Sequence, residues 1–271
     1  MPSDINSVQV LQDRHVSGLY RVAEWNLCGF KSARNPYYTI FKQTVVQSLY
    51  HDFYICPETH CLNDENVEFE NYTIYNNNRV PRANVTRGSG GIAIAVHNSV
   101  LLSHKLLSIF KGIDGQIAIK LKCNTTEVTV GILGLYLSPD SYRYGQDAEG
   151  FFNQASVIWQ DLSDCDLVLG SGDVNSRTKE ISDFIPDIDG KLIPPRFNPD
   201  NSKNAHAESF LTFLKDNRSI ILNGRVTPQL NNYTFVSTRG CSLFSARLFL
   251  LSSRQLIQLY RNENYPNVRS C

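Results

Sequence analysis

The chain has 271 residues, and its 26 basic and 26 acidic side chains give a formal net charge of zero. This balance excludes a strongly basic nucleic-acid surface at the scale of the whole chain, while a local basic patch stays open. The hydrophobic fraction of 42% is large enough for a sizeable core, and no apolar run approaches the roughly 20 residues of a membrane helix.

The N-terminal segment is polar and has no apolar stretch of the kind found in secretory signals. We therefore expect an intracellular protein, nuclear or cytoplasmic, with no membrane association. The seven cysteines include no C-x-x-C pair, and in such a compartment they are expected to be reduced packing thiols. Cys28, Cys56 and Cys61 lie near the site strands, but their spacing gives no zinc signal.

Hydrophobic periodicity predicts many strands with a few helices between them, after a loose leader over residues 1–18. The expected strands cover residues 19–26, 52–57, 72–77, 92–97, 116–122, 127–137, 166–171, 219–224 and 232–237. The expected helices cover residues 37–51, 148–162 and 205–217, the last with Phe210, Phe213 and Leu214 facing inward. Residues 181–204, rich in Pro, Asp and Asn, are expected to form a long loop.

The polar turn at residues 123–126 separates two alternating strands and predicts an antiparallel hairpin. Adjacent hairpins favour antiparallel or mixed sheets over a doubly wound parallel fold. The expected architecture is therefore α/β, with two sheets packed face to face and helices outside.

Polar side chains recur where the apolar strands end. The strand "RVAEWN" ends at Asn26, "FYICPET" at Glu58, "GILGLY" at Tyr136, and "LVLGSGD" at Asp173 with Asn175 two residues later. Taken singly, each residue could cap a turn, face solvent or pack in the core. Their recurrence favours a functional site at one edge of a sheet, built on rigid elements.

Seven segments extend the argument from single residues to a family. They read, in order, "AEWNLCGF", "ICPETH", "SGGIAIAV", "GLYLSP", "LVLGSGDVNSRT", "FLTFLKDNRSIILNGR" and "YTFVSTRGCS". Together they resemble the endonuclease/exonuclease/phosphatase family, in particular the endonuclease domains of non-LTR (LINE-type) retrotransposons, which accompany reverse transcriptases, and the craniofacial development protein 2-like proteins. The resemblance runs from about Leu19 to Ser242, and "ILNGR" followed by "YTFVS" points to the retroelement branch.

The resemblance implies a four-layer α/β sandwich that hydrolyses phosphodiester bonds of DNA with Mg²⁺ or Mn²⁺. Glu58 would be the principal metal ligand, with Asn26 beside it. Asp173 would orient the attacking water, Asn175 would donate to a phosphate oxygen, and Tyr136 would donate or position. The implied protein is a monomer without an obligate protein partner, with its domain over residues 19–250 and a divergent tail over 251–271.

The sequence departs from the family pattern after Ser242. Ser245 stands where an aspartate is expected and Ala246 where an aromatic residue is expected. No Ser-Asp-His motif follows His206, the last histidine. We expect an incomplete C-terminal part, with a strand within "LFSARLFLL", an open sheet edge, poor solubility and impaired or absent turnover, since a positioned acid/base group contributes about 10²–10⁴-fold. An altered reading of the gene and a degraded copy remain as explanations.

Two other functions stay open. The same fold could hydrolyse another phosphodiester or a phosphomonoester, or the chain could be an inactive retroelement-derived relict that binds DNA or a partner. His60, two residues after Glu58, could contact metal or substrate, although a surface histidine is expected. Six arginines could contact DNA phosphates, although solvated side chains are the default and no basic cluster interleaved with aromatic residues is visible. They are Arg79, Arg82, Arg87, Arg177, Arg225 and Arg239.

Overall fold

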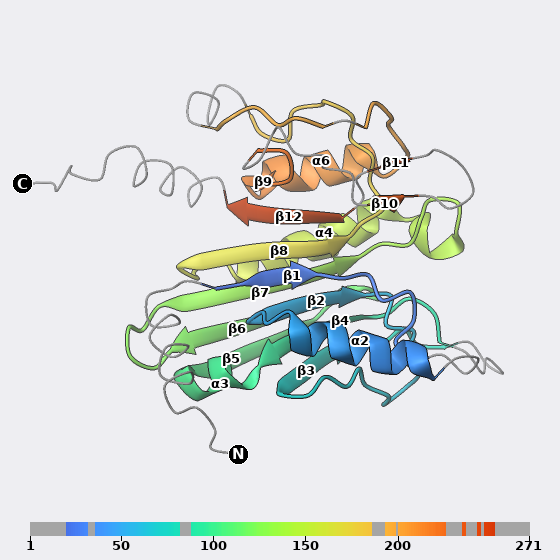
Figure 1. The fold of residues 1–271 in the computed structure, drawn as a ribbon. Helices are drawn as coiled ribbons and strands as arrows, with labels where there is room; N and C mark the ends of the chain where they lie inside the picture. The colour runs from blue at the N-terminus through green and yellow to red at the C-terminus, as the bar shows by residue number, and fades with distance from the viewer. Residues whose placement is uncertain are drawn as a thin grey trace, which may run out of the picture.

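The computed structural model describes residues 20–31, 36–81, 88–185, 193–198 and 200–225, together with the backbone of three short strands between 235 and 252. Two β-sheets lie against each other, and helices cover their outer faces (Figure 1). No helix within these ranges is both long enough and apolar enough to cross a bilayer.

The smaller sheet has four strands in the order β1-β2-β4-β3, of which β1 and β2 are parallel and the others antiparallel. Its strands are β1 (Val22–Glu24), β2 (Phe53–Pro57), β3 (Tyr72–Asn77) and β4 (Ile92–His97). Helix α2 (Tyr37–Ser48) follows β1 in the chain and covers the outer face of this sheet.

The larger sheet has six strands in the order β5-β6-β7-β8-β12-β9, and only β7 and β8 pair in parallel. Its strands are β5 (His104–Lys111), β6 (Gln116–Cys123), β7 (Thr129–Tyr136), β8 (Leu167–Asp173), β9 (Ser219–Ile221) and β12 (Arg247–Ser252). Helices α4 (Ala148–Asp161) and α6 (Ala207–Asp216) cover its outer face. The remaining elements are α3 (Asn98–Ser103), the single turn η1 (Arg143–Gly145) and a hairpin of β10 (Phe235–Val236) with β11 (Leu243–Phe244).

Alternation along the strands explains why the two sheets pack together. In β2, Phe53 and Ile55 point into the core between the sheets, whereas Tyr54 and Cys56 point toward α2. Successive side chains of a strand face opposite sides, so each strand contributes to two apolar layers. A fully buried Ile or Phe contributes about 1.5–3 kcal/mol, and both layers therefore hold the strands in register.

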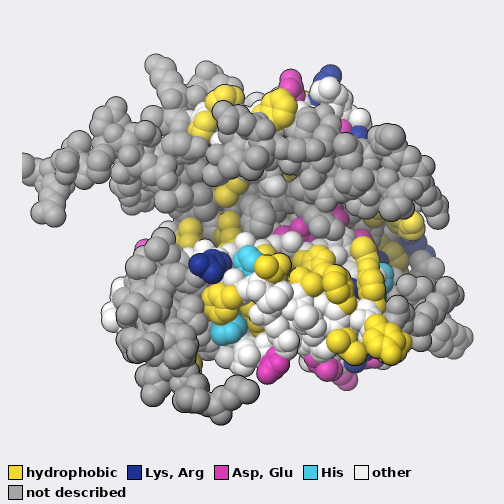
Figure 2. All heavy atoms as spheres, viewed as in Figure 1, with side chains coloured by type: hydrophobic (Ala, Val, Ile, Leu, Met, Phe, Trp, Pro, Cys, Tyr) yellow, Lys and Arg dark blue, Asp and Glu magenta, His cyan; other side chains and the backbone are white. Residues whose placement is uncertain are grey.

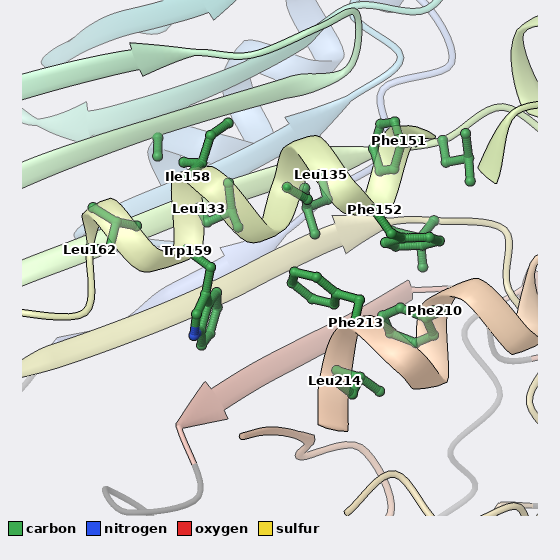
Figure 3. Close-up of a cluster of buried hydrophobic side chains, with 14 of the residues drawn as sticks. Leu133, Leu135, Phe151, Phe152, Ile158, Trp159, Leu162, Phe210, Phe213 and Leu214 are labelled. Atoms are coloured by element: carbon green, nitrogen blue, oxygen red, sulfur yellow. The ribbon is translucent and has the colours of Figure 1, made fainter. Parts of the chain in front are cut away.

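Aromatic side chains build the core under the outer helices of the larger sheet (Figure 3). Phe152 of α4 lies 5.2 Å from Phe210 and 5.7 Å from Phe213 of α6, measured between ring centroids. Trp159 meets Phe213 edge to face at 6.1 Å. These contacts fix α6 against α4. They thereby also position the chain segments that lead into and out of α6.

The outward face of α2 is apolar in its first turns (Figure 2). Tyr37, Tyr38, Ile40 and Phe41 are between 49% and 77% exposed. The single charged residue of this helix, Lys42, is instead buried. The charged group of α2 therefore lies inside the fold rather than on its surface.

The predicted fold class is confirmed: the chain forms two packed sheets, mixed and largely antiparallel, flanked by helices. The predicted hairpin is β6–β7, and the inward faces of Phe210, Phe213 and Leu214 are confirmed. Strand β5 and helix α3 were missed. Strand β12 lies between β8 and β9, in the region where a strand was expected within "LFSARLFLL".

Candidate active site

Four strands end at the same edge of the molecule (Figure 1). Strands β1 and β2 run parallel in one sheet, and β7 and β8 run parallel in the other, so each pair delivers its C-terminal residues together. Tyr136 and Asp173 are register partners at the ends of β7 and β8. Glu58 follows directly after β2, and Asn26 comes two residues after β1.

The amide of Asn26 joins the two sheets. Its Nδ2 donates to Glu58 Oε1 at 3.0 Å and to Asp173 Oδ2 at 3.1 Å. Its Oδ1 accepts from the backbone N–H of Cys28 at 3.0 Å, which fixes the orientation of the amide. Two carboxylates from different sheets therefore converge on one NH₂ group, as the strand-end pattern predicted.

The backbone around the site is strained. Cys28, Glu58, His60 and Asn175 have φ values between 46° and 54°, in the left-handed region that non-glycine residues rarely adopt. Each such residue costs about 1–3 kcal/mol and persists where the surrounding structure holds it. Here the N–H of Gly29 bonds to the carbonyl of Glu58 at 2.7 Å, which continues the β1–β2 pairing past the strand ends.

Asn175 is held on three sides. Its N–H donates to Asp173 Oδ1 at 3.1 Å, and its Nδ2 donates to the carbonyl of Leu137 at 2.9 Å. Its own carbonyl accepts from Asn204 Nδ2 at 2.7 Å and lies 3.1 Å from Nδ1 of the buried His206. The second N–H of the Asn175 amide can still donate a hydrogen bond. Donation to a phosphate oxygen, the role expected from the sequence, stays a prediction.

Tyr136 lies buried beside the carboxylates, at 5% exposure. Burial, and next the negative charge of Glu58, raise the pKa of the Tyr136 phenol. The phenol is therefore a neutral hydrogen-bond donor over the whole physiological pH range.

Two of the arginines expected to be solvated, Arg79 and Arg225, are buried. Arg79 and Arg225 are 8% and 4% exposed, and they form ion pairs with Asp114 and Asp183 respectively. Arg177 pairs with Asp200 at 2.8 Å. The expectation was wrong because the acidic partners of Arg79 and Arg225 lie 35 and 42 residues away in sequence. Arg82, Arg87 and Arg239 lie outside the described residues.

The donor set fits a hard divalent cation. No group of three His, Cys, Asp or Glu side chains that could hold a metal occurs in the described ranges. Mg²⁺, however, keeps several waters and takes only one or two protein carboxylates, and Glu58 can supply one. The Asn26 oxygen is engaged by Cys28, so a ligand role for Asn26 stays a prediction.

Two residues near the site, His60 and Cys28, differ from expectation. His60 is half-buried, and its Nε2 lies 3.7 Å from Glu58 Oε2, so it belongs to the site rather than to the open surface. Cys56 and Cys61 are buried thiols as predicted, but Cys28 is exposed, with its Sγ 3.4 Å from Asn26 Oδ1. The prediction of a packing role for Cys28 was wrong, because its thiol is exposed in the loop after β1.

Sequence reasoning missed Lys42, which supports the site from behind. Its Nζ donates to the carbonyl of Leu27 at 2.7 Å and to that of Gly29, in the loop that carries Asn26. Burial lowers the pKa of this ammonium. The available signal was a single lysine four residues before Val46, on the apolar face of a helix.

Sequence comparisons give no match: none of the protein-family models fits the chain, and no curated protein is similar to it in sequence. Solved structures do match. The chain is similar to the AP endonuclease LMAP from Leishmania major, with a TM-score of 0.66 and 14% identity over 88% of this chain and 80% of that one. It is also similar to a variant of the 3′ phosphatase NExo from Neisseria bound to a product DNA hairpin, with a TM-score of 0.59 and 13% identity over 88% of both chains. The chain thus shares its fold with these two solved structures.

Proposed function

We propose that this chain hydrolyses phosphodiester bonds of DNA with the help of a divalent metal ion. The observation that carries the proposal is the shared hydrogen bonding of Glu58 and Asp173 to the amide of Asn26 at the common edge of the two sheets. Support comes from the fold, because the solved structures similar to it include an AP endonuclease and a 3′ phosphatase bound to DNA.

Each side chain has a proposed task. Glu58 would hold Mg²⁺ or Mn²⁺ as principal ligand, with Asn26 beside it, and the ion would polarise a phosphate oxygen. The carboxylate of Asp173 would orient the attacking water and take its proton. The free N–H of Asn175 would donate to a phosphate oxygen as negative charge builds there, and the neutral phenol of Tyr136 would donate from the neighbouring strand end.

We further propose that turnover is slow. The sequence has no Ser-Asp-His motif after His206, and Ser245 and Ala246, where the family carries an aspartate and an aromatic residue, lie outside the described residues. His206 is no substitute, because it is buried and its ring nitrogens face backbone carbonyls. The second candidate function is DNA binding without turnover, and the absence of a Ser-Asp-His motif after His206 favours it. The resemblance to retrotransposon endonucleases belongs to this proposal as well.

A pair of assays separates the candidate substrates. Supercoiled plasmid is incubated with the protein in Mg²⁺ or in EDTA, and phosphate release from a phosphoinositide is followed in parallel. We expect slow nicking that requires Mg²⁺ and no phosphate release from the lipid. Phosphate release without nicking would contradict the choice of DNA, and binding of DNA without nicking by a folded protein would favour the second candidate.

A further inference from the structure

Two exposed tyrosines flank an exposed arginine on a turn that follows the end of β7. Tyr142 is 64% exposed and Tyr144 is 42% exposed, with Arg143 exposed between them. Below, "the tyrosine turn" means these three residues. Sequence reasoning did not single it out.

The tyrosine turn has a fixed shape. The N–H of Tyr142 donates to the carbonyl of Pro139 at 2.9 Å, and the N–H of Gly145 donates to the carbonyl of Tyr142 at 2.8 Å. Gly145 is required there, because a Cβ would lie 2.2 Å from the carbonyl oxygens of both Ser138 and Pro139. Exposed aromatic rings on a rigid turn lose little conformational entropy when they contact a ligand.

A buried cation supports the ring of Tyr144 from below. The guanidinium carbon of Arg79 lies 4.1 Å from the Tyr144 ring centroid. Arg79 is held in turn by its ion pair with Asp114 and by a 3.0 Å bond from Nη2 to Ser138 Oγ. The cation polarises one face of the ring and fixes it, and the ring is left partly exposed to meet a ligand.

The tyrosine turn is linked directly to the candidate active site. The buried His206 places Nε2 2.7 Å from the carbonyl of Gly145 and Nδ1 3.1 Å from the carbonyl of Asn175. The Asn175 side chain also donates a hydrogen bond to the carbonyl of Leu137, in the segment that leads from β7 into the turn. A ligand bound on the turn would therefore sit beside the residues proposed to handle the phosphate.

The surroundings select the kind of ligand. Asp140 and Asp147 flank the turn, and their oxygens accept from the backbone N–H groups of Ala205 and Gly150 respectively. Negative charge at both ends of the turn disfavours binding of another DNA phosphate there. Arg143 alone therefore cannot make a strong contact with the DNA backbone. Aromatic rings, in contrast, stack on any unpaired base through its π-face.

We infer that the tyrosine turn is a stacking platform for unpaired DNA bases next to the phosphate that the site hydrolyses. The inference rests on the proposed function and narrows it to DNA with a single-stranded segment, such as a melted stretch of supercoiled DNA or a frayed end. Each stacked ring contributes to affinity for single strands and not to affinity for a closed duplex.

Fluorescence anisotropy of the whole chain tests this inference, with a labelled oligothymidylate of about 12 nucleotides and a blunt hairpin duplex as probes. Tyr142→Ala and Tyr144→Ala should each weaken single-strand binding about tenfold and change duplex binding less than about twofold. Tyr142→Phe and Tyr144→Phe keep the ring and should bind like the wild type. Leu102→Ala removes a 67%-exposed apolar side chain from α3, outside the tyrosine turn, and serves as the matched surface control.

The outcomes separate the platform from the proposed function. Alanine variants that bind oligothymidylate like the wild type, or that lose single-strand and duplex binding equally, would overturn the platform while plasmid nicking by the wild type stands. A folded wild type that neither binds nor nicks DNA would overturn both. A higher KM with an unchanged kcat for the alanine variants in the nicking assay would support the platform, because stacking on an unpaired base binds ground state and transition state alike.

Discussion

Asn26 is an amide at a point where two carboxylates approach from different sheets. Its NH₂ group satisfies both Glu58 and Asp173, and its oxygen is fixed by Cys28. An amide is the side chain that fits, because it donates two hydrogen bonds without adding charge. An aspartate of the same shape would face two like charges across a buried contact.

Asn26→Asp should therefore destabilise the fold in a pH-dependent manner. One of the three carboxyl groups would have a folded-state pKa above its unfolded value, so the folded state would bind the extra proton and stability would fall as pH rises through this interval. We expect a melting temperature well below that of the wild type at about pH 8, and a smaller gap at about pH 5. Asn26→Ala removes the donor that the two carboxylates share but adds no charge, so its loss of stability should vary less with pH. Equal pH dependence in the two variants would contradict this account.

Tyr136 offers a second test at the residue scale. Burial and the charge of Glu58 raise its pKa, so the phenol keeps its proton over the physiological pH range. Tyr136→Phe should lower the nicking rate about tenfold or more, because it removes a donor near the phosphate. The shape of the pH–rate profile should not change. A basic limb that disappears in Tyr136→Phe would show instead that the phenol ionises during the reaction.

At the scale of elements, α2 acts on the site through Lys42. The buried ammonium of Lys42 donates hydrogen bonds to the carbonyls of Leu27 and Gly29, in the loop that carries Asn26. Lys42→Met removes both bonds from buried carbonyls and should lower the free energy of unfolding by about 1–3 kcal/mol. The exposed Lys31→Met is the control and should have little effect, since its ion pair with Glu68 is 3.8 Å long and exposed.

The lowered pKa of Lys42 also predicts how the stability of the wild type changes with pH. Because burial lowers the folded-state pKa of Lys42 below 10.5, the unfolded chain holds the proton more firmly. Wild-type stability attributable to this group should rise with pH through the interval just below 10.5. Denaturant titrations at a series of alkaline pH values measure the slope, and an unchanged slope in Lys42→Met would contradict the assignment.

Strand β12 is the second element on which the site depends. Leu250 is the register partner of Gly170 in β8 and of Ile221 in β9, so its backbone lies between two strands. Leu250→Pro should cost about 3 kcal/mol or more, because proline removes a ladder hydrogen bond inside a sheet. Since β8 ends at Asp173, nicking should fall with stability. Leu250→Val should melt close to the wild type, and a Leu250→Pro variant that does so too would place this segment outside the sheet.

At the scale of the whole molecule, local patterns predicted more than long-range contacts. Alternation and helical periodicity predicted most of the strands and the three long helices. The pattern of β5, in which exposed and half-buried residues alternate, was overlooked, and α3 is too short for a periodic signal. The hydrogen bond between Asn26 and Asp173 spans 147 residues, so the strand-end pattern could place both residues at one edge but could not specify this contact. The strand-end rule placed Asn26, Glu58 and Asp173 at one edge, as the structure does, but it could not reveal that Arg79 and Lys42 are buried supports.

One measurement tests the central claim most directly: nicking of supercoiled plasmid with protein in excess over DNA, in Mg²⁺, for the wild type and Glu58→Gln. The substitution keeps the shape of the side chain, replaces a carboxylate oxygen that accepts from Asn26, and removes the charge proposed to hold the metal. We predict slow nicking by the wild type that stops in EDTA, at least about 100-fold slower nicking by Glu58→Gln, and unchanged nicking by Leu102→Ala. Equal nicking by the wild type and Glu58→Gln, nicking that persists in EDTA, or no nicking by a folded wild type would contradict the account.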